Sequence, residues 1–352
     1  MDQQVHKGLA QSREFLARFQ AGIPWERVLL VCHPASFQKS GAEAWFRSMT
    51  DSAPPRFVDF SSNPKSAEVE RGVTQFTAAR AEALIAIGGG SILDMAKLIN
   101  FFGSCNLGVD AYLDQVRPSS ASLRPLLAVP TTAGSGSEAT HFAVIYRGKA
   151  KYSVAAPAIR PSHVLLAPEF TWSLPAYPTA CTGLDALAQA IESHWARKAT
   201  EESRRYARQA LGLAWDHLAA AVNAPAPEHR AAMLEAAHWA GRAIDVTQTT
   251  GAHAFSYALT TEFGLPHGQA VALLLPFFIA YHARMGIQVE TVNAERVLAL
   301  VHEVGLDRKL PATGGEIHGL LTRHVNLERL SNNPVPVPDD LVREIAQGLA
   351  GR

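Results

Sequence analysis

Residues 83–97, with the sequence ALIAIGGGSILDMAK, give the strongest indication of the fold of this chain. An apolar run of strand length leads directly into three glycines, and a helical pattern continues from there to about Phe102. A buried strand that turns tightly into a helix is the building unit of parallel sheets with crossover helices. Ser91 and Asp94 form a capping-box-like pair, so helix initiation alone explains part of the segment.

Glycines at this point also allow the backbone to approach a phosphate group. The N–H groups of Gly89 and Gly90 could contact a pyrophosphate, and the positive end of the next helix would face its charge. A second loop, residues 129–138 (VPTTAGSGSE), again follows an apolar run. Its hydroxyl groups suit hydrogen bonds to ribose and phosphate at the carboxyl ends of parallel strands. The alternatives are a purely structural turn for the first loop and a flexible Gly/Ser loop for the second.

The rest of the chain divides into a strand–helix half and a helical half. Apolar runs predict strands at 27–32, 56–60, 83–87, 126–129 and 163–166, with a hairpin over 142–155. Helical patterns in this half lie at 40–48, after a loop at Pro34, and at 66–80. Later helices are predicted at 179–197, 201–222, 228–247, 250–262, 268–284, 291–304 and 339–349. We therefore expect an α/β domain with a parallel sheet over residues 1–175 and an all-α domain over residues 176–352.

Residues 251–270 (GAHAFSYALTTEFGLPHGQA) carry two histidines on either side of a predicted helix break. On one unbroken helix, His253 and His267 would lie roughly 21 Å apart, too far to share an ion. Gly264 can end a helix and Pro266 can start the next one, so both rings could face one place. Either the two rings bind one metal ion, or they are unrelated members of the chain's 14 histidines.

Asp185 and Gln189 lie four residues apart, so a helix places both side chains on one face. An ionised aspartate on an otherwise apolar helix needs a cation or a basic side chain as its partner. Together with His253 and His267, Asp185 makes a mixed oxygen and nitrogen set suited to Zn²⁺ or Fe²⁺. A salt bridge from Asp185 to an arginine is the alternative.

Composition excludes several classes of protein. The formal net charge is zero, so no basic excess indicates a nucleic-acid partner. The longest apolar run is interrupted by Pro276 and is too short to span a membrane. Three widely spaced cysteines indicate neither a disulfide framework nor a thiolate metal site. We expect a cytoplasmic protein with a small-molecule substrate and neither a nucleic-acid nor a membrane partner.

Four segments resemble, in order and at the expected intervals, the signature blocks of the iron-containing (group III) alcohol dehydrogenase family. They are AIGGGSILDMAK, AVPTTAGSGSEAT, TGLDALAQAIES and GAHAFSYALTTEFGLPHGQAVALLLP, and the resemblance covers roughly residues 28–282. It implies a Rossmann-like N-terminal domain, an all-helical C-terminal domain and an NAD(P)-dependent alcohol dehydrogenase or aldehyde reductase. It also implies NADPH or NADH, a divalent Fe²⁺ or Zn²⁺ ion, and a homodimer.

The resemblance assigns a role to each matching position. The pyrophosphate would be held by Gly89, Gly90 and Ser91, with Asp94 near the nicotinamide. The rest of the cofactor would contact Thr131, Thr132, Ser135 and, at the ribose, Lys151. The metal ligands would be Asp185, His253 and His267.

Several positions depart from the family pattern, including Ala167-Pro168, where the family commonly has Asp-Pro, and three candidate site residues. Gln189 replaces a fourth histidine ligand, and its amide oxygen coordinates more weakly than imidazole. Tyr257 replaces a histidine of the pocket, so the proton donor beside the catalytic ligand His267 would be either Tyr257 or water. His33 replaces an aspartate after the first strand. Because this removes a charge that would repel a 2′-phosphate, NADPH becomes a candidate beside NADH.

Further segments resemble the phosphonoacetaldehyde reductase subgroup, namely AQAIESHWA, residues 200–203 and Asn332-Asn333-Pro334. This resemblance implies metal-dependent, NAD(P)H-linked reduction of phosphonoacetaldehyde to 2-hydroxyethylphosphonate. A phosphonate needs cations, for which Lys151, Arg160, Arg197 and Lys198 are candidates by chain position. The alternatives are a general alcohol dehydrogenase for small aldehydes, a maleylacetate-type reductase, and a catalytically silent nucleotide-binding protein.

Overall fold

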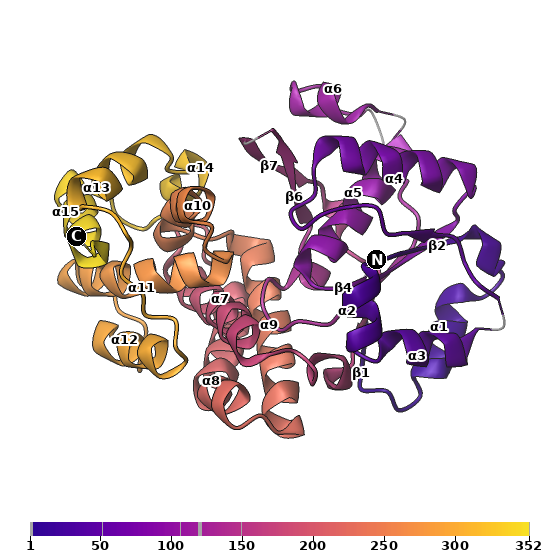
Figure 1. Cartoon of the computed structure of the whole chain (residues 1–352), viewed down its shortest axis with the longest axis horizontal. Coiled ribbons are helices and arrows are strands. Elements are labelled where there is room, and N and C mark those ends of the chain that lie inside the picture. The colour runs from indigo at the N-terminus through magenta and orange to yellow at the C-terminus, as the bar shows by residue number, and fades with distance from the viewer. Residues whose placement is uncertain (1–2, 51, 106, 119–121, 149, 352) are drawn as a thin grey trace. The chain divides into compact units, whose positions relative to one another are not determined.

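The structure is a computed structural model and describes residues 3–50, 52–105, 107–118, 122–148 and 150–351. The chain forms two compact units (Figure 1). The N-terminal unit comprises Met1–Thr132 and Ser137–Leu174, and the helical unit comprises Ala133–Gly136 and Pro175–Arg352. Four residues of the second glycine loop therefore pack with the helical unit. No helix in the described part of the chain combines the length and apolar character needed to cross a membrane.

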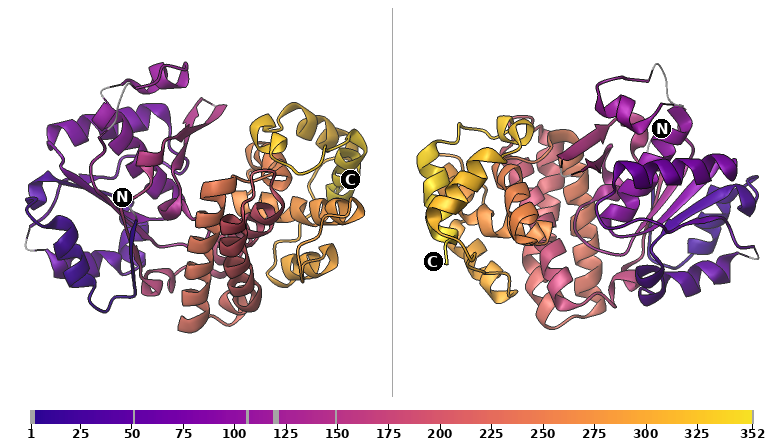
Figure 2. Two further views of the ribbon diagram at one scale, coloured as in Figure 1. Left: turned by 180° about the vertical axis from the view of Figure 1, so that it is seen from behind. Right: turned by 45° about the horizontal axis from the view of Figure 1, so that its top comes forward.

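A six-stranded parallel sheet forms the centre of the N-terminal unit (Figure 2). The strand order is β1-β8-β5-β4-β2-β3. The strands are β1 (Gln4–Lys7), β2 (Val28–Cys32), β3 (Arg56–Phe57), β4 (Ala83–Gly88), β5 (Leu126–Pro130) and β8 (His163–Leu166). The predicted hairpin is present as β6 (Phe142–Arg147) and β7 (Ala150–Ala155), which pair antiparallel. The edge strand β1 was not predicted, because its residues are mostly polar and exposed.

Helices cover both faces of this sheet, which explains why β2 and β4 are buried along their whole length. Leu29 and Val31 of β2 pack on one face, whereas Val28 and Leu30 pack on the other. The helices are α1 (Ser12–Gln20), α2 (Pro34–Lys39), α3 (Ala42–Met49), α4 (Ser66–Ala78), α5 (Gly90–Cys105) and α6 (Val109–Leu113). The loop predicted at Pro34 was wrong: this proline occupies the first turn of α2, where its missing N–H has no helical acceptor to lose.

Lys97 of α5 is fully buried and ties this helix to the segment that follows the second glycine loop. Its Nζ donates hydrogen bonds to Ser137 Oγ at 2.9 Å, Thr140 Oγ1 at 3.0 Å and the Phe142 carbonyl at 2.9 Å. The Ser137 hydroxyl in turn donates to the Asp94 carboxylate, which lies 3.8 Å from the ammonium. A buried cation therefore ties α5, which begins at the first glycine loop, to the segment that follows the second loop.

The helical unit is built around α7 (Ala176–Trp195), which is buried on nearly every face and packs against α8, α9 and α11. The other helices are α8 (Glu201–Asn223), α9 (Pro227–Thr247), α10 (Gly251–Phe263), α11 (His267–Arg284), α12 (Ala294–Glu303), α13 (Gly314–Arg323), α14 (Leu327–Ser331) and α15 (Asp339–Leu349). Helices α13 and α14 were not predicted. They are short, and begin at side-chain caps from Thr313 and Asn326. The cysteines Cys32, Cys105 and Cys181 are free, as predicted.

Replacing Lys97 with methionine is expected to lower the free energy of unfolding by about 3 kcal/mol, because it leaves Asp94 without its buried counter-charge. Urea denaturation followed by circular dichroism measures this loss. Lys39→Met, at an exposed position on α2, serves as the control and should change stability by less than about 0.5 kcal/mol. Equal stability of the two variants would contradict a bracing role for Lys97.

Candidate active site

Three side chains from three helices converge within the helical unit. Asp185 of α7, His253 of α10 and His267 of α11 each offer one ligand atom, and these atoms lie within 4.8 Å of one another. Asp185 Oδ1 lies 3.1 Å from His253 Nε2 and 3.9 Å from His267 Nε2. Asp185 and His253 are buried, whereas the side chain of His267 is 37% exposed. The cluster is therefore buried at Asp185 and His253 and open to solvent at His267.

The predicted helix break brings the two imidazoles together. Gly264 ends α10 in the left-handed conformation, with φ 65° and ψ 21°, and Pro266 directly precedes α11, which begins at His267. The centroids of the two imidazole rings lie 5.4 Å apart. A continuous helix would hold them roughly 21 Å apart. The prediction that this break points both histidines at one place is confirmed.

Gly268 allows α11 to reach α7. A Cβ atom at this position would lie 1.9 Å from the Cys181 carbonyl oxygen and 3.2 Å from Asp185 Cβ. No side chain fits between the two helices here. The missing side chain at Gly268 thus sets the distance between its neighbour His267 and the Asp185 carboxylate.

A second buried carboxylate, Glu192, lies behind His253 and was not singled out from the sequence. Its Oε2 lies 2.6 Å from His253 Nδ1. Burial opposes a charge on His253, but Glu192 and Asp185 outweigh it and raise the pKa of His253 to about 10. Burial likewise opposes ionisation of the two carboxyls, yet contacts with His253 and its neighbours lower the pKa of both. The two carboxylates therefore stabilise positive charge at this site.

Charge and donor chemistry both fit a divalent cation. A bound divalent ion would displace any proton from the ligating ring nitrogens, and its charge would then balance the two carboxylates of Asp185 and Glu192. Gln189, one turn from Asp185, is buried, and its Oε1 has no hydrogen-bond partner among the described residues. An unsatisfied buried oxygen next to one carboxylate and two imidazoles is the arrangement expected of a fourth, weaker ligand. The set suits Zn²⁺ or Fe²⁺.

Tyr257 lies against one of the candidate ligands. Its ring stacks on the His267 imidazole, with a centroid separation of 5.8 Å and an angle of 14° between the ring planes. The residue is half-buried, like the His267 side chain on which it stacks. Its role as a proton donor stays a prediction.

The two glycine loops of the N-terminal unit lie against each other at the carboxyl ends of β4 and β5. A Cβ atom on Gly89 would lie 3.3 Å from Thr132 Oγ1, and Thr131 N donates to the Gly88 carbonyl at 3.0 Å. Helix α5 starts at the first loop, so its positive end lies at this edge of the sheet. The adjacency of the loops supports their predicted role at a nucleotide.

The other predicted cofactor residues lie around this edge. Ser91 Oγ accepts a hydrogen bond from Asn63 N at 3.2 Å, and Asp94 Oδ2 accepts one from Val144 N at 2.9 Å. Asp94 therefore braces β6 in addition to any contact with a ligand. The remaining predicted residues are His33, exposed at the end of β2, Lys151 on β7, Ser135 in the segment that packs with the helical unit, and Gly90 at the start of α5.

Hydrogen bonds link the segments that resemble the phosphonoacetaldehyde reductase subgroup near the C-terminal end of α7. Arg197 Nε donates to the Asn333 carbonyl at 2.8 Å, and Lys198 Nζ donates to Gln248 Oε1 at 2.9 Å. The buried Asn332 Nδ2 donates to the carbonyls of Thr247 and Thr249. Arg197 therefore ties the end of α7 to the segment after α14, and Lys198 ties it to the α9–α10 connection. These contacts weaken the candidacy of both residues as phosphonate ligands.

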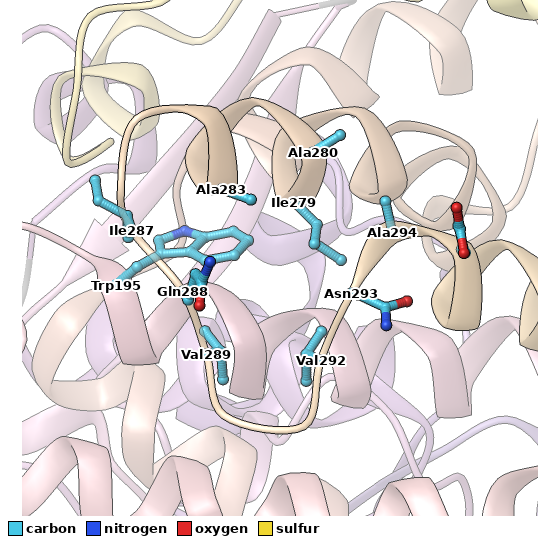
Figure 3. Close-up of a pocket in the computed structure, with 11 residues that line it drawn as sticks. Trp195, Ile279, Ala280, Ala283, Ile287, Gln288, Val289, Val292, Asn293 and Ala294 are labelled. Atoms are coloured by element: carbon cyan, nitrogen blue, oxygen red, sulfur yellow. The ribbon is translucent and has the colours of Figure 1, made fainter.

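A pocket of about 440 Å³ lies beside the end of α11 and the start of α12 (Figure 3). Its walls are mostly apolar and include Trp195, Ile279, Ile287, Val289 and Val292. None of the candidate metal ligands lines it. Trp195 Nε1 donates to Thr250 Oγ1 at 3.0 Å, so one wall is linked to the residue that precedes α10.

Family comparisons cover most of the chain. Residues 6–168 match the iron-containing alcohol dehydrogenase family, and residues 179–327 match the C-terminal domain of the Fe-containing alcohol dehydrogenase family. The chain belongs to the iron-containing alcohol dehydrogenase family. The predicted α/β plus all-α architecture and the family resemblance are thereby confirmed.

Individual relatives share the family but differ in substrate. A phosphonoacetaldehyde reductase of Streptomyces viridochromogenes is 38% identical over 220 residues, which cover 59% of this chain and 55% of that protein. A choline dehydrogenase of Bacillus subtilis is 30% identical over 269 residues, 74% of this chain and 67% of that protein. The chain thus spans only about half the length of the first of these relatives.

Solved structures match over nearly the whole chain. A sulfoacetaldehyde reductase from Bifidobacterium kashiwanohense, solved in complex with NAD⁺, has a TM-score of 0.88 and 29% identity, covering 99% of this chain and 97% of that one. An iron-containing alcohol dehydrogenase from Thermotoga maritima has a TM-score of 0.87 and 26% identity, covering 99% and 98%.

Replacing Gly268 with alanine should lower the free energy of unfolding by about 2 kcal/mol or more, because the new methyl group overlaps the Cys181 carbonyl. Thermal denaturation measures the loss. Gly212→Ala on α8 is the matched control, since a Cβ there has no atom within 4 Å. We expect it to stabilise the helix by up to about 1 kcal/mol. A Gly268→Ala protein as stable as the wild type would contradict the close α7–α11 contact.

Proposed function

We propose that this protein is a metal-dependent, NAD(P)H-linked aldehyde reductase that converts phosphonoacetaldehyde to 2-hydroxyethylphosphonate. The observation that carries the proposal is the convergence of Asp185, His253 and His267, with the unsatisfied oxygen of Gln189, in a member of the iron-containing alcohol dehydrogenase family. An intact ligand set argues against a catalytically silent nucleotide-binding protein.

The proposed ligands are Asp185, Gln189, His253 and His267. When bound, the divalent cation polarises the aldehyde oxygen as a Lewis acid and the reduced nicotinamide supplies the hydride. The buried pair Asp185 and His253 would hold the ion in place, and the partly exposed His267 would lie on the side open to substrate. Tyr257 is our candidate for the proton that the product oxygen gains, because its ring stacks on His267.

The proposed cofactor site is the pair of glycine loops at the edge of the parallel sheet. Gly89, Gly90 and Ser91 would hold the pyrophosphate at the start of α5. The remaining proposed contacts are Asp94, Thr131, Thr132, Ser135 and Lys151. His33 brings no carboxylate to the end of β2, so we propose that NADPH is accepted as well as NADH. We also propose a homodimer, on the family resemblance alone.

The choice of substrate rests on two relatives. The names phosphonoacetaldehyde and sulfoacetaldehyde both denote a two-carbon aldehyde that carries a tetrahedral anionic group. The relative named phosphonoacetaldehyde reductase is 38% identical to this chain over 220 residues. A second candidate is a dehydrogenase for uncharged alcohols, supported by a 1-propanol dehydrogenase of Citrobacter freundii that is 33% identical over 231 residues, 65% of this chain and 59% of that protein.

A panel of aldehydes separates these candidates. We expect kcat/KM for phosphonoacetaldehyde to exceed that for acetaldehyde and propanal by roughly 10- to 100-fold, the value of one charge-assisted hydrogen bond to the anion. The assay follows the nicotinamide absorbance with NADH and NADPH in turn, and includes sulfoacetaldehyde. Faster turnover of the uncharged aldehydes would refute the phosphonate assignment and leave the reductase assignment standing.

A variant of one proposed ligand tests the metal assignment in the same assay. His267→Ala should reduce kcat/KM by roughly 100-fold or more while the protein stays folded and binds cofactor. His302→Ala is the matched control, because that side chain is 79% exposed on α12. Full activity in His267→Ala would show that the ligand set is wrong.

A further inference from the structure

We propose that Glu192 is a positioning residue for the metal centre: it fixes the ring orientation and the tautomer of His253, so that Nε2 faces the other ligands. This inference rests on the proposed metal site. Glu192 would not bind the ion itself, because its partner is His253 Nδ1, whereas the proposed ligand atom of His253 is Nε2.

Glu192 is fully buried in α7, two helical turns after Asp185. Its Oε2 accepts hydrogen bonds from His253 Nδ1 at 2.6 Å and from Thr250 N at 2.8 Å. Its Oε1 accepts from Ala252 N at 2.8 Å and more weakly from His253 N at 3.4 Å. Four N–H groups thus surround one carboxylate, which leaves it no freedom to move away from the imidazole.

The carboxylate decides which nitrogen of His253 carries the proton. An ionised glutamate only accepts hydrogen bonds, so Nδ1 must be the donor. In the neutral ring, Nε2 then has the free lone pair, and Nε2 is the atom 3.1 Å from Asp185 Oδ1. A histidine that ligates a metal in this way commonly donates its other N–H to a carboxylate, which fixes the ring and increases its basicity. Here that effect would strengthen a site whose fourth ligand is an amide.

Glu192 has a second possible role, as a cap for α10. The first turn of this helix receives no side-chain cap from Thr250, and the Glu192 carboxylate accepts hydrogen bonds from its N–H groups instead. Capping alone would affect the stability of the metal-free protein and leave its metal affinity unchanged. Metal affinity and metal-free stability must therefore be measured separately.

Glu192→Gln is the decisive variant, because the amide is nearly isosteric but removes the negative charge next to Nδ1, and in either orientation its nitrogen cannot accept the two hydrogen bonds that the replaced oxygen accepts. Metal-free proteins are compared by thermal denaturation, and Zn²⁺ affinity is measured by competition with a chromophoric chelator. We expect Glu192→Gln to weaken Zn²⁺ binding by about 10- to 100-fold. Glu192→Asp, which keeps the charge on a shorter side chain, should bind Zn²⁺ with intermediate affinity.

Ser193→Ala provides the matched control. Ser193 is the next residue of α7, and its buried hydroxyl accepts a hydrogen bond from Thr247 Oγ1 at 3.1 Å, on a side chain that forms no hydrogen bond with Glu192 or His253 in the described part of the chain. This variant should bind Zn²⁺ as the wild type does, whatever its melting temperature. The Co²⁺-loaded proteins add a second readout, since the visible spectrum of Co²⁺ changes when the geometry of its ligands changes.

The outcomes are distinct. A Glu192→Gln protein that melts at a lower temperature but binds Zn²⁺ like the wild type would overturn the proposal and leave Glu192 as a cap. If Glu192→Gln does not fold, wild-type Zn²⁺ affinity in Glu192→Asp overturns it instead. A wild-type protein that binds no Zn²⁺ or Co²⁺ refutes the proposed metal site itself, and with it this inference.

Discussion

Two carboxylates buried in a single helix are the constraint on which the helical unit depends. Asp185 and Glu192 lie on α7 with almost no contact with water, and ionised groups in such surroundings require nearby positive charge or hydrogen-bond donors. His253 lies between them and contacts both. The break at Gly264 and the close α7–α11 approach at Gly268 bring His267 to the same place. Side chains from α10 and α11 thus surround the carboxylates of α7.

In the N-terminal unit, the buried charge is the Lys97 ammonium, which binds neighbouring segments of the same unit. Lys97 holds the segment after the second glycine loop, while its neighbour Asp94 braces β6. Both loops follow central strands of a parallel sheet that is covered on both faces, so their backbones are held rigidly at the edge where such sheets bind ligands. A loop that binds a cofactor through backbone N–H groups needs this kind of fixed frame, because its affinity depends on geometry more than on side-chain chemistry.

Local signals in the sequence predicted the central strands, the long helices and the helix break, because each depends on neighbouring residues. Asp185, His253 and His267 were found from residue type and spacing together with the family resemblance. Glu192 was missed, since its importance depends on a partner 61 residues away. It could have been noticed as an acidic residue on the same apolar helix as Asp185. Gly268 was missed because its role exists only once α11 lies on α7. Strand β1 and helix α2 were missed because a polar edge strand and a proline at a helix start look like loops.

We propose that the helical unit holds one divalent ion between α7, α10 and α11. Anomalous X-ray diffraction from crystals of Zn²⁺-loaded protein, recorded on both sides of the zinc absorption edge, tests it most directly. We expect a single strong anomalous peak bonded to Asp185, His253 Nε2 and His267, with Gln189 Oε1 as the remaining protein ligand. A peak elsewhere in the molecule, or a zinc ion bonded to His253 through Nδ1, would contradict it.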